Sequence, residues 1–247
     1  MTGARARVRA ELTREIADVA RRHLASDGAA ALSLRAVARE LGMASSAVYR
    51  YFPSRDDLLT ALIVDAYDAL GEAAERADAA RDPDDLRGRW HAACGAARDW
   101  AVAHPHEYAL VYGSPVPGYA APETTIGPAS RVGEVLCAIV ARGVASGVVD
   151  PGADGTDALH PGIAERMGLP PDSALAARAI FAWTALFGML GFELFGHTHN
   201  VVDDHTAFFR DATDRLADQL GLPPDGSGTS RLFDQGTAAV ASRSATP

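Results

Sequence analysis

The stretch that most constrains the fold of this chain runs from Ser33 to Phe52. After Ser33, which can act as an N-cap, apolar residues recur at i, i+3, i+4 and i+7, as on one face of a short helix. Gly42 follows where the chain must turn, and a second helix is predicted from Ser45 to Phe52, ahead of Pro53. The pattern predicts two short helices joined by a tight turn.

Within this stretch, a small residue, a glycine and an apolar residue stand at the spacing of a DNA-binding helix-turn-helix. Ala38 lets the two helices cross closely, Gly42 makes the turn, and Val48 holds the second helix on the first. An ordinary pair of core helices would satisfy the same short pattern. The residues on either side favour the DNA-binding interpretation.

Those residues carry a family resemblance: the segment Ser33–Leu59 resembles the N-terminal domain of TetR-family transcriptional regulators. The positions that match the family motif are Val37, Ala38, Gly42, Val48, Tyr49, Phe52, Ser54 and Leu58. The positions that depart from it are Met43, Ala44, Tyr51 and Arg55. Ala44 lacks the hydroxyl that usually opens the recognition helix, so Ser45 is expected to cap that helix instead.

A DNA-contacting surface follows from this resemblance and from side-chain chemistry. The resemblance implies phosphate contacts from Tyr49, Tyr51 and Arg55, and three more side chains are candidates by their chemistry: Ser33, Arg35 and Arg50. Base reading is expected from the start of the recognition helix, at Met43, Ala44, Ser45 and Ser46. This set has few bidentate donors, so discrimination would depend on the arginines, thymine methyl groups, water or DNA shape. Solvated surface residues are the alternative.

The charge of the chain is divided unevenly. Its net charge is -9, but residues 1–60 contain ten arginines and seven acidic residues, a net charge of +3, which leaves -12 for the remainder. A basic head on an acidic body suits a protein that presents one end to phosphate. Residues 1–9 include three of these arginines and are expected to be either a flexible arm that adds phosphate contacts or a solvated terminus.

The periodicity of the remaining chain predicts an all-α protein with two helical domains. The expected parts are a three-helix DNA-binding domain at 1–54, a connecting helix at 55–83, a regulatory and dimerisation domain at 84–222, and a disordered tail at 223–247. Helices are expected from His106 to Tyr112 and from Ala129 to Ser146, among others, with mostly loop from Val148 to Ser173.

Two segments of the later region, His104–Pro122 and Phe181–Gly196, resemble a TetR-type C-terminal regulatory domain. The resemblance implies a pocket for a small-molecule effector in that domain. Aromatic side chains around an apolar space are a usual way to hold such a molecule, and the candidates here are Trp100, Tyr108, Tyr112, Trp183 and Phe187. Plain core packing is the alternative for each of them.

The predicted helix Ser173–Phe195 is apolar on nearly every side, and such a helix must be covered all round. With the amphipathic helix Asp203–Leu220 it would complete a four-helix bundle across a two-fold axis. A homodimer is therefore expected, with an interface that includes Leu186, Leu190, Phe192, Glu193, Phe209 and Leu216. Glu193 needs a partner, which the sequence leaves open between a second copy and a ligand.

Other functions find little support in the sequence. No catalytic motif is visible, and His197, His199 and His205 are better explained as a solvated loop than as a metal site, so no cofactor is expected. Cys94 and Cys137 are expected to be reduced core thiols. No signal peptide is visible, and the most apolar stretch, of about 14 residues, is too short to span a bilayer, which predicts a cytoplasmic protein with no membrane partner.

These observations predict a homodimeric transcriptional regulator, most simply a repressor of a near-palindromic operator in double-stranded DNA. Its two recognition helices would enter successive major grooves, about 34–36 Å apart, and a small molecule in the C-terminal domain would change that separation. Two rivals are a DNA-binding protein that no ligand regulates and an enzyme with a DNA-targeting head. The absence of a catalytic constellation argues against the enzyme.

Overall fold

The computed structural model describes residues 2–153, 155–156, 158–171 and 173–224, and within these ranges it contains helices and no strands. This confirms the predicted all-α class. Two 3-10 helices are η1 (Ala29–Ala31) and η2 (Glu123–Thr125). The α-helices are α1 (Thr2–Asp27), α2 (Leu34–Glu40), α3 (Ser45–Val48), α4 (Arg55–Ala79), α5 (Leu86–Ala103), α6 (Pro105–Tyr112), α7 (Ile126–Ala145), α8 (Ile163–Arg166), α9 (Leu175–Leu194) and α10 (His205–Leu220).

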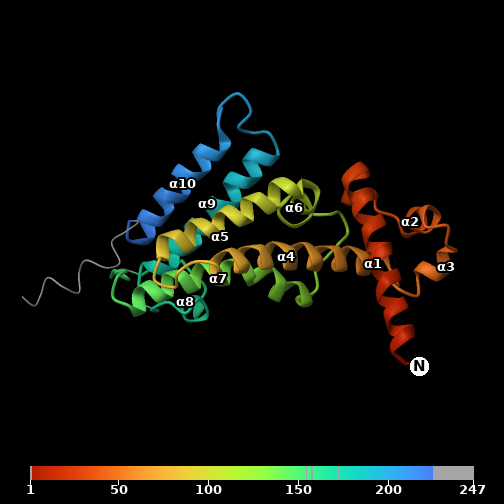
Figure 1. The fold of residues 1–247 in the computed structure, drawn as a ribbon, viewed down its shortest axis with the longest axis horizontal. Coiled ribbons are helices and arrows are strands. Elements are labelled where there is room, and N and C mark those ends of the chain that lie inside the picture. The colour runs from red at the N-terminus through yellow and green to blue at the C-terminus, as the bar shows by residue number, and fades with distance from the viewer. Residues whose placement is uncertain (1, 154, 157, 172, 225–247) are drawn as a thin grey trace, which may run out of the picture.

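Helices α1 to α3 form a small head at one end of an elongated molecule (Figure 1). Its core is built from the apolar face of α1, around Ile16 and Val19, packed against Val37 of α2 and Val48 of α3. The first turns of α4 close this core with Leu58 and other buried leucines. Helices α2 and α3 are short, so tertiary packing and not propensity holds them in place.

Helix α4 connects the head to the rest of the chain, because its two halves belong to different cores. Leu62 packs in the head, whereas Ala66 and Leu70 pack in the core of the C-terminal domain. The helix begins with a capping box: the Ser54 hydroxyl accepts from the Asp57 amide at 3.0 Å and donates to the Asp57 carboxylate at 2.7 Å.

The C-terminal domain is a bundle in which α4 packs against α5 and α7, while α9 and α10 pack against α5 and each other. Trp90 of α5 is buried and donates from its indole nitrogen to the Thr213 carbonyl of α10 at 2.9 Å. Arg87, also buried, forms ion pairs with Asp214 and Asp218 and donates to the Leu222 carbonyl at 2.8 Å. These contacts fasten the end of α10 to the bundle.

Two local predictions are corrected by the structure. Residues 2–9 are the first turns of α1 and not a flexible arm, as suits a segment of alanine and arginine, both strong helix formers. The recognition helix α3 ends at Val48, and Tyr49 to Tyr51 form turns before Phe52. Pro53 contributes to this early end because it disfavours the helical conformation in the residue before it.

The apolar helix α9 lies within the predicted helix Ser173–Phe195. It has 20 residues, and an 18-residue segment of it has a mean hydropathy of 1.6, so by length and composition it is able to cross a membrane, unlike the most apolar stretch of about 14 residues on which the prediction was based. In this structure α9 packs against α5, α6 and α10, as a core helix does. Most of the tail predicted at 223–247 lies outside the described residues, which end at 224.

Candidate DNA-binding surface and C-terminal cavity

The turn between α2 and α3 has the geometry that the spacing of Ala38, Gly42 and Val48 predicted. Gly42 has a φ of 64°, in the left-handed region that side chains resist. Next to it, the Met43 amide donates to the Ala38 carbonyl at 2.9 Å, which closes the turn. Ala38 and Val48 are buried where the helices cross. The polar ends of α2 and α3 are thereby held on the outside of the head.

Most of the residues predicted to contact DNA lie on this outer surface. Those that are exposed are Arg35, Ala44, Ser45, Ser46, Tyr49 and Arg50. Tyr49, with 41% of its surface exposed, presents a phenol hydroxyl to solvent. Ser33 occupies the N-cap position of α2 as predicted, but its side chain makes no capping hydrogen bond, which leaves its hydroxyl for another partner.

The start of α3 differs from the prediction in one detail. Its N-cap is Ala44, and no side chain caps the helix, so the expected transfer of that role to Ser45 is wrong. Ser45 is instead the first helical residue. Because a short helix without a cap has free amides at its start, the Ser45 and Ser46 hydroxyls and these amides are exposed together.

Three of the residues predicted to contact DNA make packing contacts or hydrogen bonds within the head itself. Met43 and Tyr51 are half-buried and pack against the head core. The guanidinium of Arg55 donates to the carbonyls of Leu32, Ala29 and Ala30 at 3.2, 2.9 and 3.2 Å. With these donors used, Arg55 holds the α1–α2 connection in place, which is a different role from the phosphate contact that the resemblance implied.

Arg9, one of the three arginines of the expected N-terminal arm, lies near this surface on α1. Its guanidinium lies over the Tyr51 ring, 5.1 Å from the centroid, and donates to the Arg50 carbonyl at 3.2 Å. The sequence feature that indicates this position is the spacing of Arg5 and Arg9, because residues four apart lie on the same side of a helix.

The aromatic residues predicted to wall a pocket lie together, but mostly in contact with one another. The ring centroids of Tyr112 and Phe187 are 4.2 Å apart in a stacked arrangement, and those of Trp183 and Phe187 are 6.0 Å apart. Tyr108 is buried and donates to the Phe187 carbonyl at 2.7 Å. Burial raises the pKa of both Tyr108 and Tyr112. Trp100 stacks separately on His104.

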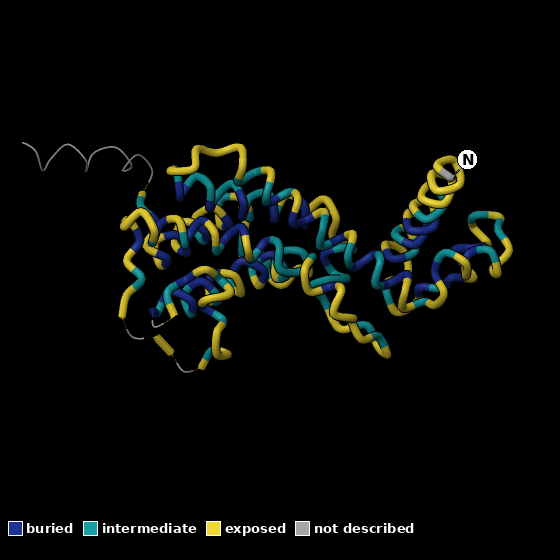
Figure 2. Tube along the Cα trace, turned by 90° about the horizontal axis from the view of Figure 1, so that it is seen from below, coloured by how far each residue is buried: buried dark blue, intermediate teal, exposed yellow. Residues whose placement is uncertain are grey.

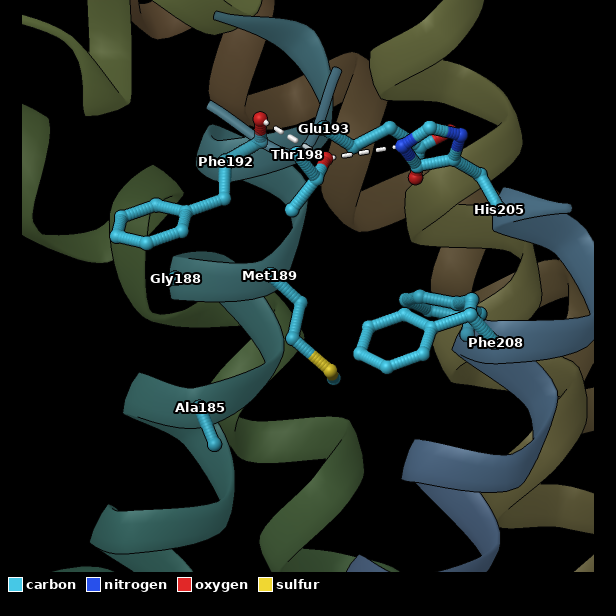
Figure 3. A pocket seen from close by; sticks show the side chains of 9 residues that line it. Ala185, Gly188, Met189, Phe192, Glu193, Thr198, His205 and Phe208 are labelled. Atoms are coloured by element: carbon cyan, nitrogen blue, oxygen red, sulfur yellow. Dashed lines mark hydrogen bonds between the residues drawn. The ribbon is translucent and has the colours of Figure 1, made fainter. Parts of the chain in front are cut away.

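A cavity of about 320 Å³ lies next to this aromatic cluster, between α9 and α10. Figure 3 shows Met189 and Phe208 on opposite walls, with Thr198 and His205 at one end. The Thr198 hydroxyl and the His205 Nε2 are 2.9 Å apart. Apart from Thr198, His205 and Glu193, the residues that line the cavity are apolar. The cavity therefore suits an apolar molecule with a single polar group.

The residues predicted for a dimer interface are mainly core residues of the single chain. Leu186 and Leu190 are fully buried, and Phe209 and Leu216 are nearly so. Glu193 pairs with Arg98 of α5 in the same chain, through hydrogen bonds of 2.9 and 2.6 Å. Of the six predicted residues only Phe192 is strongly exposed. The prediction missed this because α9 is apolar all round, so the sequence does not show which side of the helix faces the core.

A different apolar face remains uncovered on α9 and α10. Phe181 and Phe192 are 54% and 58% exposed, and Phe208 on α10 is 47% exposed. Between the two phenylalanines of α9 the same side carries the small residues Ala185 and Gly188. In the described part of the chain, no group of three or more His, Cys, Asp or Glu side chains is placed to hold a metal ion.

The head and the C-terminal domain are joined by polar contacts as well as by α4. Arg21 of α1 lies 3.2 Å from the Glu107 carboxylate of α6. The Thr60 and Tyr119 hydroxyls are 2.9 Å apart, and Tyr67 donates to the Val111 carbonyl at 3.1 Å. Helix α6 and the segment after it therefore contact both the aromatic cluster and the head, as their position in Figure 1 shows.

Comparison with known families gives two matches along the chain. Residues 16–62 match the family of bacterial regulatory proteins called the tetR family. Residues 90–216 match the family described as tetracyclin repressor-like, C-terminal domain. The first match spans the helix-turn-helix, and the second spans the domain that holds the aromatic cluster and the cavity.

Individual relatives agree with these matches. The HTH-type transcriptional regulators Rv1816 of Mycobacterium tuberculosis and Mb1846 of Mycobacterium bovis are each 41% identical over 203 residues, which cover 78% of this chain and 85% of theirs. The crystal structure of SCO4313 is similar, with a TM-score of 0.72 and 34% identity over 86% of this chain and 98% of that one. A protein from Rhodococcus sp. RHA1 has a TM-score of 0.67 and 26% identity, over 85% and 95%.

Proposed function

The chain belongs to the TetR family of bacterial regulatory proteins, and on that premise we propose that it is a cytoplasmic, homodimeric repressor that a small molecule releases from its operator. The observation that carries the DNA-binding part is the helix-turn-helix itself. Its turn at Gly42 holds Ser45, Ser46 and Tyr49 on an exposed surface, with Arg35 and Arg50 beside them. Hydroxyls and guanidinium groups in such an arrangement suit phosphates and base edges.

A selection experiment tests this part directly. The full-length protein is used to select duplexes from a random pool, and the enriched sequences are expected to contain two related half-sites, one per copy. Ser46→Ala should change which bases are enriched, while Tyr49→Phe should weaken binding to all duplexes. A pool that shows no enrichment would contradict sequence-specific binding.

Repression is proposed because a dimer on a near-palindromic site would obstruct a promoter that contains that site. Transcription in vitro from a promoter carrying the selected sequence separates the possibilities. A repressor lowers transcript yield as protein is added, whereas an activator raises it. The relatives are named as transcriptional regulators.

For the effector we propose the cavity between α9 and α10. Its volume of about 320 Å³ and its mostly apolar lining, with the Thr198 and His205 pair at one end, suit a small apolar molecule with one polar group. A molecule bound there lies against α9, which also carries Phe187 of the aromatic cluster that packs on α6. It changes DNA affinity only if it binds the two arrangements of the heads unequally.

Thermal shift measurements test this site. Molecules that raise the melting temperature of the wild type should lose that effect with Met189→Trp, which fills the cavity. Phe195→Trp, at the C-cap of the same helix and exposed, serves as the control for added bulk. If active molecules stabilise both variants equally, the effector site lies elsewhere, and if a broad screen leaves operator affinity unchanged, the ligand-independent alternative is favoured.

For the dimer we propose the exposed apolar face that contains Phe181, Phe192 and Phe208. Phe192 and Phe208 also line the cavity, so a second copy on this face would cover the mouth of the proposed effector site. An uncovered group of large apolar side chains favours association, and Ala185 and Gly188 between them allow a second helix to approach closely. Helices α9 and α10 of two copies would then form a four-helix bundle. Light scattering at micromolar concentration tests this, since a monomeric mass would refute it.

A further inference from the structure

The first turns of α1 extend beyond the core of the head. Figure 2 shows this N-terminal end as exposed, apart from the rest of the head. Further along the helix, the side that faces the core carries Ile16 and Val19. Because an α-helix repeats every 3.6 residues, the same side in the overhanging turns carries Arg5 and Arg9. The face of α1 that packs against the head core is therefore basic in the turns that extend beyond that core.

A shallow groove of about 430 Å³ lies between these overhanging turns of α1 and Tyr51, at the end of the recognition segment, which comprises α3 and the turns from Tyr49 to Tyr51. It is lined by Ala4, Arg5, Val8, Arg9 and Tyr51. Arg9 is held there by the Tyr51 ring, 5.1 Å from its guanidinium carbon, and by a 3.2 Å hydrogen bond to the Arg50 carbonyl. A guanidinium has five N–H donors, so most of those on Arg9 remain available to a ligand in the groove.

The charge of this groove is not compensated by the protein. Arg5 and Arg9 are one helical turn apart, where like charges repel, and no carboxylate lies within 4 Å of either guanidinium in the described residues. Later on the same helix, Arg21 pairs with Asp65 and Arg22 pairs with Glu40. An anion placed between Arg5 and Arg9 would relieve their repulsion.

The other arginines at this end of α1 have acidic residues near them on the helix. Arg7 has Glu11 four residues later, and Arg14 has Glu11 three residues before it and Asp18 four residues after it. These spacings bring opposite charges together on a helix. Arg7 and Arg14 are also about half a turn round the helix from Arg5, at 100° per residue. Of these arginines, only Arg5 and Arg9 are both next to Tyr51 and without an acidic neighbour.

We propose that this groove holds one phosphate group of the DNA backbone, bound by the guanidinium groups of Arg5 and Arg9 and the hydroxyl of Tyr51. Paired guanidinium groups suit the geometry and charge of a phosphate. The groove lies beside the end of the recognition segment, so the phosphate belongs to the strand flanking the major groove that α3 enters. The contact fixes the register of the head and reads no sequence. This inference rests on the proposed DNA-binding function.

The salt dependence of affinity for the selected operator duplex tests the proposal. Each phosphate contact contributes about 0.9 to the slope of log K against log salt concentration. Arg5→Ala should therefore lower the slope by about two for a dimer and weaken binding at least fivefold at 0.15 M salt. Arg14→Ala, which removes the same charge from the opposite side of α1, should change the slope by less than half as much. Circular dichroism checks that both variants keep their helix content.

A second measurement locates the phosphate. Single methylphosphonate groups, which are uncharged, are placed along the flank of each half-site. At one position the wild type should lose more affinity than Arg5→Ala, since one of the two guanidinium partners of that phosphate is already missing in the variant. Equal slopes for Arg5→Ala and Arg14→Ala, or equal losses of both proteins at every position, would overturn the phosphate site. If the wild type selects no duplex at all, the proposed function fails instead.

Discussion

The guanidinium of Arg21 on α1 lies 3.2 Å from the carboxylate of Glu107 on α6. The same guanidinium pairs with Asp65 of α4 at 2.6 Å, so one side chain of the head contacts both helices of the C-terminal domain that reach it. A displacement of α6 would therefore act on α1 directly. This ion pair is a physical route by which events in the C-terminal domain would reach the DNA-binding surface.

Glu107→Gln is expected to weaken operator binding up to about fivefold, since a partly exposed ion pair contributes about 0.2–1 kcal/mol and the head would be held less firmly. Loss of a negative charge alone acts in the opposite direction, because it strengthens attraction to DNA. Glu123→Gln, at an exposed position in η2, is the control with the same charge change. Titrations at one salt concentration measure both, and tighter binding by Glu107→Gln would contradict the coupling.

Arg55→Ala is expected to lower the free energy of unfolding by about 1–3 kcal/mol, because it leaves carbonyls of the α1–α2 connection without their charged donor. Its salt slope for DNA should change little. Arg35→Ala, at an exposed position, should show the reverse: unchanged stability and a lower slope. Urea unfolding followed by far-UV circular dichroism gives the stabilities. A stable Arg55→Ala with a reduced slope would restore the phosphate role implied by the family resemblance.

Glu193→Ala is expected to destabilise the protein by about 3–5 kcal/mol, because it leaves the Arg98 charge unpaired where both side chains are largely buried. The double variant Arg98→Met, Glu193→Leu should recover most of this loss, since neither charge then remains. Unfolding of the wild type, Arg98→Met, Glu193→Leu and the double variant forms a double-mutant cycle. Simple additivity of the two single losses would show that the pair contributes nothing as a pair.

Phe192→Arg and Leu190→Arg, two residues apart on α9, are expected to have different effects. Phe192 is exposed, so its replacement should produce a folded monomer that binds a single half-site weakly. Leu190 is fully buried, so its replacement should unfold the C-terminal domain by placing an unpaired charge in the core. Light scattering and circular dichroism distinguish the two outcomes. A dimeric Phe192→Arg protein would move the interface away from this face.

Cys137 is expected to react slowly with iodoacetamide in the native protein, because burial and the nearby Glu134 raise its pKa to about 11. The thiolate is the reactive form, so the alkylation rate should rise about tenfold per pH unit from pH 8 to 10. Cys94→Ser isolates the signal of Cys137, although burial also raises the pKa of Cys94 and suppresses its reactivity. A rate that is flat over this pH range would show that the raised pKa is absent.

Much of the head was predictable because its constraints are local. A small residue, a turn glycine and an apolar residue at fixed spacing determine how two adjacent helices cross, and Ala38, Gly42 and Val48 take those positions in the structure. The capping box at Ser54 is likewise local. The exposed contact residues of α2 and α3 followed from the same spacing.

Other features depended on residues distant in the sequence. Arg55 was assigned to phosphate from the family motif, yet its donors are used by carbonyls more than 20 residues away. The sequence left residues 1–9 open between an arm with phosphate contacts and a solvated terminus, whereas in the structure these residues are helical and Arg9 lies over the Tyr51 ring. The partner of Glu193, left open by the sequence, proved to be Arg98 of the same chain.

The helical class, the helix-turn-helix and the need to cover α9 were all predictable from the amino-acid sequence. Which side of α9 faces inward depends on how the helices pack in three dimensions. A helix that is apolar round its circumference has no side that prefers the core over solvent. The inward side of α9 is therefore set by its packing against α5, α6 and α10. That packing buries Leu186 and Leu190, exposes Phe181 and Phe192, and leaves the cavity beside Met189.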